Sequence, residues 1–186
     1  MTEQSETKTK ATWKIDPIHS SLEFAVKHMV IATVRGRFTK FDIDVDFDEA
    51  HPERSKVDVR VDVASIDSRE PDRDTHLRSA DFFDVEKFPS MTFHLRQIEP
   101  QGEGRSRLIG DLTIKDVTRE VVLDAELNGP AKDPWGNERL GVAAETTIGR
   151  ENFSLAWNVP LETGGFLVGD AVKILVEAEL VKQQSG

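Results

Sequence analysis

Apolar and charged residues alternate with a period of two over most of the chain. In the stretch KVDVRVDVASID, valine occupies every second position from 57 to 63, and the positions between are Asp or Arg. Side chains of a β-strand point to opposite faces in turn, so this pattern places the valines on one face and the charges on the other. Such a pattern is typical of a half-buried antiparallel strand.

A second alternating stretch, KFDIDVDFD, carries aspartates at four alternate positions: Asp42, Asp44, Asp46 and Asp48. A run of aspartates is also found in calcium-binding loops. An EF-hand loop, however, needs a glycine at its centre, and this stretch has none. The strict alternation with apolar residues therefore favours a strand whose aspartates all face solvent.

Similar segments recur along the chain and are separated by turns rich in Gly, Pro, Asn and Asp. They predict about eight strands in up-and-down order. A closed barrel is the simplest arrangement of eight such strands because closure removes the sheet edges, and a two-sheet sandwich satisfies nearly the same pattern. The expected strands span residues 19–28, 34–48, 56–66, 90–99, 106–115, 118–128, 139–149 and 171–182.

One segment breaks the period of two. Between Pro71 and Pro89, Leu77 and Ala80 recur at helical spacing, and Asp72 is a suitable N-cap. We therefore expect a short helix followed by a loop around residues 72–89.

Three phenylalanines fall within the loop of this segment: Phe82, Phe83 and Phe88. Three aromatic side chains in seven residues of a connection must bury their apolar surface. They either plug one end of the barrel or form the lid of a pocket.

The chain has 186 residues, enough for one domain with a sizeable core, and its formal net charge is −10. This charge predicts repulsion from nucleic acid and from anionic lipid headgroups. There is no cysteine, which excludes disulfides and thiolate metal sites. We divide the chain into a disordered tail at 1–11, one barrel domain at 12–182 and a flexible end at 183–186.

The sequence contains no apolar segment of the length that a spanning helix needs, and its N-terminus lacks the apolar region of a secretory signal. The expected location is therefore the cytoplasm, with the periplasm or secretion as the less favoured alternative.

Motifs of common catalytic classes are missing from the sequence. It contains no G-x-S-x-G elbow, no phosphate-binding glycine loop, no H-E-x-x-H and no tyrosine. His19, His28, His76 and His94 are scattered, and no pair has the i, i+2 or i, i+4 spacing of a metal site on one element. We therefore expect no metal, no cofactor and no enzymatic activity.

Two histidines lie in DPIHSSLEFAVKHM. His28 shares the parity of the apolar residues at 22, 24 and 26, so its ring is expected to face inward. It would there be a hydrogen-bonded core histidine, a polar contact of a ligand or, as the least favoured reading, a catalytic or metal-binding residue. His19 has the opposite parity and is expected to tether the strand end or to rim a mouth.

Four strings resemble the YceI-like family, which is also described as polyisoprenoid-binding. They are DPIHSSLEFAVKHM, RDTHLRSADFFDVEKFPSMTF, GDLTIKDVTREVVL and VGDAVKILVEAEL, in the family's order and spacing, and the likeness covers nearly all of residues 12–182. Asp116 stands where the family often has glycine, in a turn that tolerates aspartate.

The resemblance implies a lipocalin-like antiparallel β-barrel that holds a long isoprenoid chain, such as a polyprenyl compound or a quinone tail, in an apolar tunnel. It also implies a homodimer. From the residues alone, an eight-stranded interior can equally be filled by its own side chains.

The expected ligand-binding residues are mostly the inward-facing apolar side chains. They are Phe24, Val26, His28, Phe38, His76, Phe82, Phe83, Phe88, Phe93, Leu112, Ile114, Phe153, Trp157 and Ile174. The candidates for meeting a polar head group are His19, Arg73 and Arg78. Alternatively, the two arginines only form ion pairs with Asp72, Asp81 or Asp84.

The sequence thus predicts a non-enzymatic carrier of an isoprenoid lipid. Two rivals remain open at this point. One is an enzyme on a lipid-like substrate that uses His28 or His76 as a general base beside a carboxylate. The other is a structural or stress-response barrel with a filled interior and no ligand.

Overall fold

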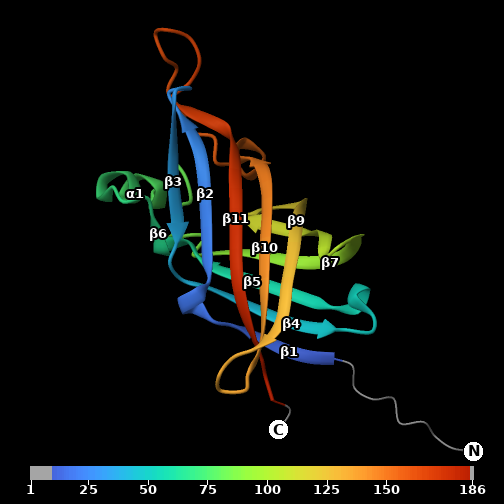
Figure 1. The fold of residues 1–186 in the computed structure, drawn as a ribbon. Coiled ribbons are helices and arrows are strands. Elements are labelled where there is room, and N and C mark those ends of the chain that lie inside the picture. Colours follow the sequence, from blue (N-terminus) through green and yellow to red (C-terminus); the bar gives the residue numbers. More distant parts are fainter. Residues whose placement is uncertain (1–9, 185–186) are drawn as a thin grey trace, which may run out of the picture.

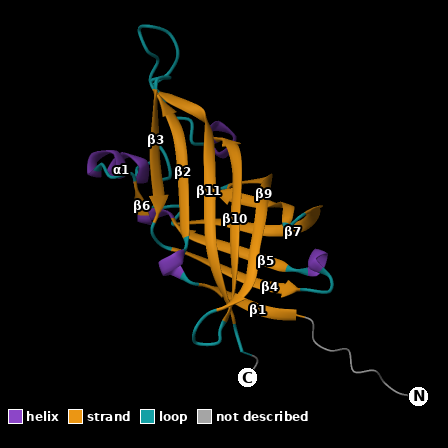
Figure 2. Ribbon diagram, in the orientation of Figure 1, coloured by secondary structure: helices purple, strands orange, loops and turns teal. Residues whose placement is uncertain are grey.

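The computed structural model describes residues 10–184, and strands dominate this range (Figures 1 and 2). The elements in chain order are β1 (Lys10–Ile15), η1 (Pro17–His19), β2 (Ser21–His28), β3 (Ala32–Phe38), β4 (Phe41–Asp48), η2 (Pro52–Arg54), β5 (Lys56–Asp62), η3 (Val63–Ser65), β6 (Ile66–Asp67), α1 (Pro71–Arg78), β7 (Ser90–Gly102), β8 (Arg105–Ile114), β9 (Val117–Lys132), β10 (Glu138–Gly149), η4 (Arg150–Phe153) and β11 (Val168–Lys182).

Eight of the strands form a closed antiparallel barrel, as the sequence predicts. The order is β1-β4-β5-β7-β8-β9-β10-β11, and β11 pairs again with β1 to close the ring. Closure leaves no free edge around this part of the molecule.

The last strand continues beyond the closed ring and carries a second set of strands. β11 pairs with β1 only at Leu180–Lys182, whereas its earlier part pairs with β2. β2 pairs in turn with β3, and β3 with the short β6. These strands form an upper extension next to α1, at the opposite end from the C-terminus (Figure 1).

Two of the predicted strands are interrupted, and this difference from the sequence expectation produces the extension. Residues 34–48 split into β3 and β4 at Thr39–Lys40, and residues 56–66 split at η3. A further strand, β1, occupies residues expected to belong partly to a disordered tail: Lys10 and Ala11 pair with Asp48 and Phe47. The rest of that expected tail, and residues 185–186 of the expected flexible end, lie outside the described residues.

Two local expectations were wrong. The helix is capped by Glu70, whose side chain accepts from the backbone N–H of Asp72, and it ends at Arg78, so Asp72 is not the N-cap and Ala80 lies beyond the helix. The three phenylalanines lie in the loop after it, as expected. Asp48 is buried, and its carboxylate accepts from the backbone N–H groups of Ala50 and His51. It therefore stabilises the turn after β4 and does not share the solvent face of Asp44.

The core has two parts that lie one above the other along the barrel. The upper core includes Leu22, Phe38, Phe82 and Phe153, and the lower core is built around Trp13. Phe41, Val59 and Val176 are among the side chains that pack against both parts. Apolar side chains therefore line the barrel interior from one end to the other.

Candidate functional site

The lower half of the barrel encloses an apolar cavity of about 300 Å³. Its walls come from β4, β5 and β7–β11, with Ile43, Phe93 and Leu140 among the lining residues. Of the residues that line it, only Ser55, Arg105 and Ser106 carry polar side chains, and its edge reaches the β7–β8 turn. We call this the lower cavity.

A second cavity of about 100 Å³ lies in the upper core, under α1 and the loop that follows it. Phe24, Phe38, Phe82 and Phe83 contribute to its lining, and Arg150 is the one charged residue there. We call this the upper cavity. The interior is thus partly hollow, which the alternation of residues alone left open.

A layer of side chains separates the two cavities. Phe93 and Val176 line the lower cavity and also pack against the upper core. The ring of Phe93 lies over Gly110, where a Cβ atom would come within 2.5 Å of its Cζ. The ring of Phe24 lies over Gly36 in the same way. Because Gly110 and Gly36 have no side chain, the rings of Phe93 and Phe24 can lie against the barrel wall. A larger residue at either position would push the ring further into the interior.

Arg150 is the charged residue of the interior that the sequence did not single out. It is 3% exposed, and its guanidinium donates to four backbone carbonyls, those of Leu155, Trp157, Val168 and Gly169. Burial lowers the pKa of this guanidinium, while Asp170 and Glu151 act in the opposite direction. In the sequence it is one arginine after a strand, and no local signal distinguishes it from surface arginines.

Many of the predicted ligand-binding residues do line a cavity. Those around the upper cavity are Phe24, Val26, Phe38, Phe82, Phe83, Ile114 and Ile174, and Phe93 lines the lower one. Leu112 and Phe153 belong to the buried upper core, and Trp157 packs against it.

The remaining predicted residues lie at the periphery. His28 is half-buried at the end of β2, opposite Val168, and Phe88 is half-buried in the loop before β7. Both lie outside the two sets of cavity-lining residues. His76 contacts the rings of Phe82 and Trp157, with centroids 5.1 and 4.5 Å away. All three residues were predicted to bind the ligand, but their contact with one another was not predictable because Trp157 is far along the chain.

The two arginines proposed for a head group have another role in this structure. Arg73 donates to the hydroxyl and carbonyl oxygens of Ser68, and Arg78 donates to the carbonyls of Ala64 and Ile66. They therefore hold α1 against the segment that includes η3 and β6. The alternative expectation, ion pairs with neighbouring aspartates, does not describe them either.

The scattered histidines of the sequence do not converge in the structure. His19 pairs with Asp16 on η1, His76 with Asp81 beyond α1, and His94 with Asp58 across β5 and β7. Each pair is on a different element. The described residues therefore do not assemble the multi-histidine site that the scattered histidines allowed.

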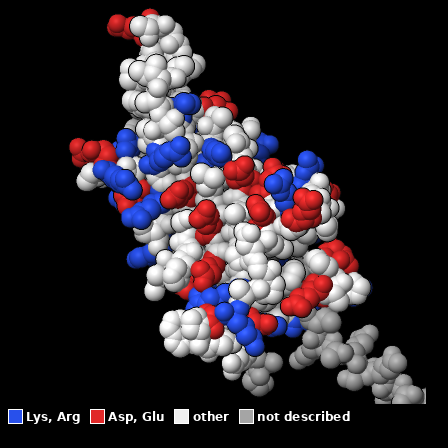
Figure 3. Space-filling view, viewed as in Figure 1, with Lys and Arg blue, Asp and Glu red and all other residues white. Residues whose placement is uncertain are grey.

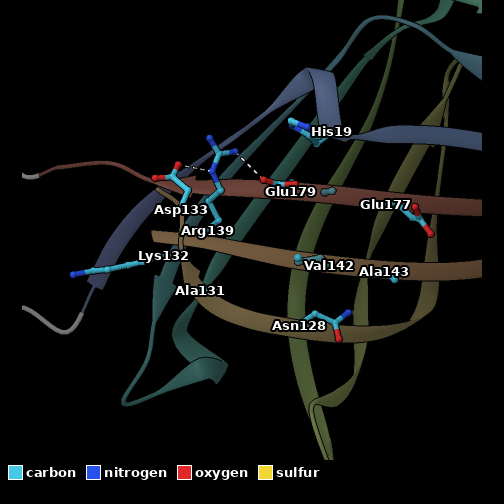
Figure 4. A pocket seen from close by; sticks show the side chains of 12 residues that line it. His19, Asn128, Ala131, Lys132, Asp133, Arg139, Val142, Ala143, Glu177 and Glu179 are labelled. Atoms are coloured by element: carbon cyan, nitrogen blue, oxygen red, sulfur yellow. Dashed lines mark hydrogen bonds and ion pairs between the residues drawn. The ribbon is translucent and has the colours of Figure 1, made fainter. Parts of the chain in front are cut away.

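An outer groove of about 490 Å³ lies over β9–β11 and is edged by charged residues (Figure 4). Arg139 occupies its end, where Nη1 donates to Asp16 and Glu179 at 2.7 Å each and Nε to Asp133 at 2.8 Å. Hydrogen bonds from His19 and Arg139 lower the pKa of Asp16 to about 2. The hydrogen bond from Arg139 is also the largest cause of the lowered pKa of Asp133.

This cluster includes three residues in a metal-like arrangement. The ligand atoms of Asp16, His19 and Glu179 lie within 4.8 Å of one another. The guanidinium of Arg139 already bonds two of the three and would repel a metal cation. We therefore interpret the cluster as an ion-pair network that joins η1 to β10 and β11.

The network predicts a defined pH dependence for the variant Arg139→Gln. A carboxyl group whose pKa is lowered by folding contributes stability above its ordinary value near 4, and this contribution is lost as pH falls through the folded value. We expect the variant to unfold at lower urea concentration than the native protein at pH 5.5, and the difference to shrink between about pH 4 and pH 2. Urea unfolding at a series of pH values measures this.

The control for this variant is Arg37→Gln, which breaks an exposed ion pair with Asp67. The pKa of Asp67 is lowered mainly by the backbone N–H of Arg69, so this variant should leave the pH dependence nearly unchanged. A constant difference between Arg139→Gln and the native protein across the whole pH range would contradict the assignment.

The model of the protein family described as YceI-like domain matches residues 13–180 of the chain. The chain belongs to the YceI-like family. A UPF0312 protein of Staphylococcus aureus strain MSSA476 is 39% identical over 165 residues, which cover 88% of this chain and 94% of that protein. The likeness therefore spans the barrel together with its upper extension.

Solved structures agree with this assignment. A Campylobacter jejuni YCEI protein superposes with a TM-score of 0.72 at 32% identity, covering 85% of this chain and 90% of that one. A polyisoprenoid binding domain from Saccharophagus degradans superposes with a TM-score of 0.70 over 93% of this chain and 99% of that one, at 12% identity. The second likeness shows that the fold is shared. In the described part of this YceI-like protein, no helix has the length and apolar character needed to cross a membrane.

Proposed function

We propose that this YceI-like protein binds a long-chain isoprenoid lipid in the barrel interior and releases it chemically unchanged. The observation that carries the proposal is the pair of apolar cavities stacked along the barrel, of about 300 and 100 Å³. The lower cavity alone reaches the lower end of the usual range for ligand sites, about 300–1,000 Å³. A ligand that continues past Phe93 would occupy both cavities.

The chemistry of the walls suits a hydrocarbon chain. A buried methylene contributes about 0.8 kcal/mol, and micromolar binding corresponds to about 8 kcal/mol. About ten buried carbons therefore suffice before the entropic cost of binding is counted, and a few isoprene units exceed that number. Hydrogen bonds along the tail are not needed.

Support for the isoprenoid class comes from the structural likeness to the Saccharophagus degradans domain, which is described as polyisoprenoid binding. That protein shares the fold at low identity, so the ligand class is carried over here as part of the proposal. In this chain the head group is proposed to lie at the upper end, because the partly exposed His76 lies beside the upper cavity against Phe82.

A carrier fits the interior better than an enzyme. The ionisable residues that line the two cavities are Arg105 and Arg150, and a guanidinium remains protonated and cannot serve as a general base. The dyad of His76 and Asp81, with 2.8 Å between Nε2 and Oδ2, lies partly exposed outside the cavity walls. The enzymatic alternative named His28 or His76, and of these two only His76 forms an ion pair with a carboxylate among the described residues.

The proposal is tested by organic extraction of freshly purified protein and mass spectrometry of the extract. We expect a polyprenyl or quinone species in near-stoichiometric amount. Incubation with a labelled isoprenoid should return the same compound, and a chemically altered product would establish the enzymatic alternative. An empty extract that stays empty after incubation with isoprenoids of several lengths would contradict the proposal.

A further inference from the structure

An exposed apolar projection stands at the upper end of the molecule. It combines the β2–β3 turn (residues 29–31) with the loop 158–167, and the backbone N–H of Met29 donates to the carbonyl of Leu167 at 2.8 Å. We call these two segments the apolar tip, which appears in Figure 3 as a projection without charged side chains except for an acidic group at its outer end. Among residues 10–184, five of the eight exposed large apolar side chains belong to it: Met29, Val30, Ile31, Val159 and Phe166.

Folding does not require these residues in the β2–β3 turn. Met29 and Val30 have φ angles of 52° and 66°, and the backbone N–H of Ile31 donates to the carbonyl of His28. Turns with two central residues at positive φ prefer Asn-Gly, and a β-branched residue is strained there. Val30 and Ile31 are 68% and 85% exposed. Apolar side chains at Met29 and Val30 therefore weaken the turn, and Val30 and Ile31 gain little burial within this chain.

Two cations lie directly below the tip on the same hairpin. Lys27 on β2 and Arg35 on β3 are exposed, and neither forms an ion pair with any residue in the described range. Glu162 is the acidic residue of the loop, and Asp170 lies beyond it at the start of β11, where it accepts from the backbone N–H of Glu151. Glu151 in η4 is exposed next to Asp170, and further acidic residues such as Glu70 and Asp72 lie on and beside α1. The other acidic residues are distributed over the barrel.

We propose that the apolar tip inserts into the headgroup region of an anionic lipid bilayer, with Lys27 and Arg35 against the lipid phosphates. Apolar side chains that enter the interface and cations that meet anionic headgroups are the two contributions that bind proteins to such surfaces. At 0.15 M salt the screening length is about 8 Å, so the acidic residues of the distant barrel repel the surface only weakly.

The apolar tip lies close to the upper cavity, so a bilayer contact at the tip bears on how a ligand would reach that cavity. Val26 and Val168 line the upper cavity, and β2 and β11 lead from them to the tip within three residues. The bilayer contact is inferred from exposed residues and does not depend on what the cavity holds. If the proposed function is correct, it brings the upper cavity next to the membrane from which a lipid would be taken.

A second copy of this chain is a less suitable occupant. A stable protein interface uses about 20–30 residues on each side, and the tip offers five exposed large apolar residues on a narrow projection. A two-fold contact through the tip would also bring Lys27 and Arg35 of both copies near the same axis.

The test is co-sedimentation of the full chain with sucrose-loaded vesicles of phosphatidylcholine, with and without phosphatidylglycerol. We expect binding that increases at least tenfold when phosphatidylglycerol is included. The double variant Met29→Asn, Val30→Gly introduces the preferred turn residues, so it should fold at least as stably as the native protein and yet lose most of the binding. The double variant Lys27→Gln, Arg35→Gln should lose the preference for phosphatidylglycerol, about fivefold for each cation.

Trp135→Ser is the matched control. Trp135 is 82% exposed in the turn before β10, near the opposite end of β11, and its loss should leave vesicle binding unchanged. Undiminished binding by the Asn-Gly variant, or loss of binding with Trp135→Ser, would overturn the assignment of the tip. So would a native dimer that the Asn-Gly variant converts to a monomer. A protein whose organic extract stays empty after incubation with isoprenoids, and which still binds phosphatidylglycerol vesicles, would refute the proposed function and leave the membrane contact standing.

Discussion

Replacing Phe83 with aspartate is expected to reduce the lipid that co-purifies with the protein at least tenfold. Phe83 lines the upper cavity, and its ring meets the ring of Phe38 edge to face with 6.0 Å between centroids. A carboxylate at position 83 would have to give up its hydrating water to lie beside the apolar tail of the ligand. A tenfold loss corresponds to about 1.4 kcal/mol, and burial of an unpaired polar group costs about 2 kcal/mol or more.

Two variants separate this effect from general damage to the loop. Phe83→Leu keeps an apolar side chain in the cavity and should retain most of the lipid. Phe88→Asp places the same charge in the same loop at a half-buried residue outside the cavity-lining sets, and should also retain it. A folded Phe83→Asp protein with the native lipid content would show that the tail does not pass beside this residue.

The variant Arg150→Met is expected to lower the free energy of unfolding by about 3 kcal/mol. Four backbone carbonyls would lose their donor, and a hydrogen bond to a charged group contributes about 1.5–3 kcal/mol. The gain from no longer burying a cation offsets part of the sum. Because domains are stable by only about 5–15 kcal/mol, the loss is readily measured by urea unfolding.

Arg150→Lys and Arg37→Met provide the comparison. Lysine keeps the charge but offers one nitrogen where arginine offers three, so it should recover only part of the stability. Arg37 forms an exposed ion pair with Asp67, whose loss should cost no more than about 1 kcal/mol. A cost below that value for Arg150→Met would mean that the segment 155–169 is held to the barrel by other contacts.

The strands and their faces are predictable from local sequence. The alternation at 57–63 and at 41–48 placed Val61, Ile43 and Val45 on the buried face, and they are buried in the structure. Side-chain direction reverses at every residue of a strand, so the pattern of one strand is sufficient to assign its faces. The four strings that resemble the YceI-like family added the family assignment, which the comparisons confirm.

The places where strands break were less predictable. The sequence KATWKI at β1 is short and mixed in polarity, and it becomes a strand because β4 and β11 pair with it on both sides. The bends between β3 and β4 and between β5 and β6 likewise follow from strands that leave the closed ring for the upper extension. These pairings depend on distant partners and have no signal within a short window.

By itself the sequence determined the all-β class, the inward faces and the family, because each follows from residues close together in the chain. The tertiary structure decided that the interior is partly hollow, that Phe83 borders a cavity while Phe88 does not, and that Arg150 is buried. It also brought Arg139 to Asp16, 123 positions away. The physical reason is that cavities and long-range contacts depend on strand register and barrel closure, which many weak interactions determine together.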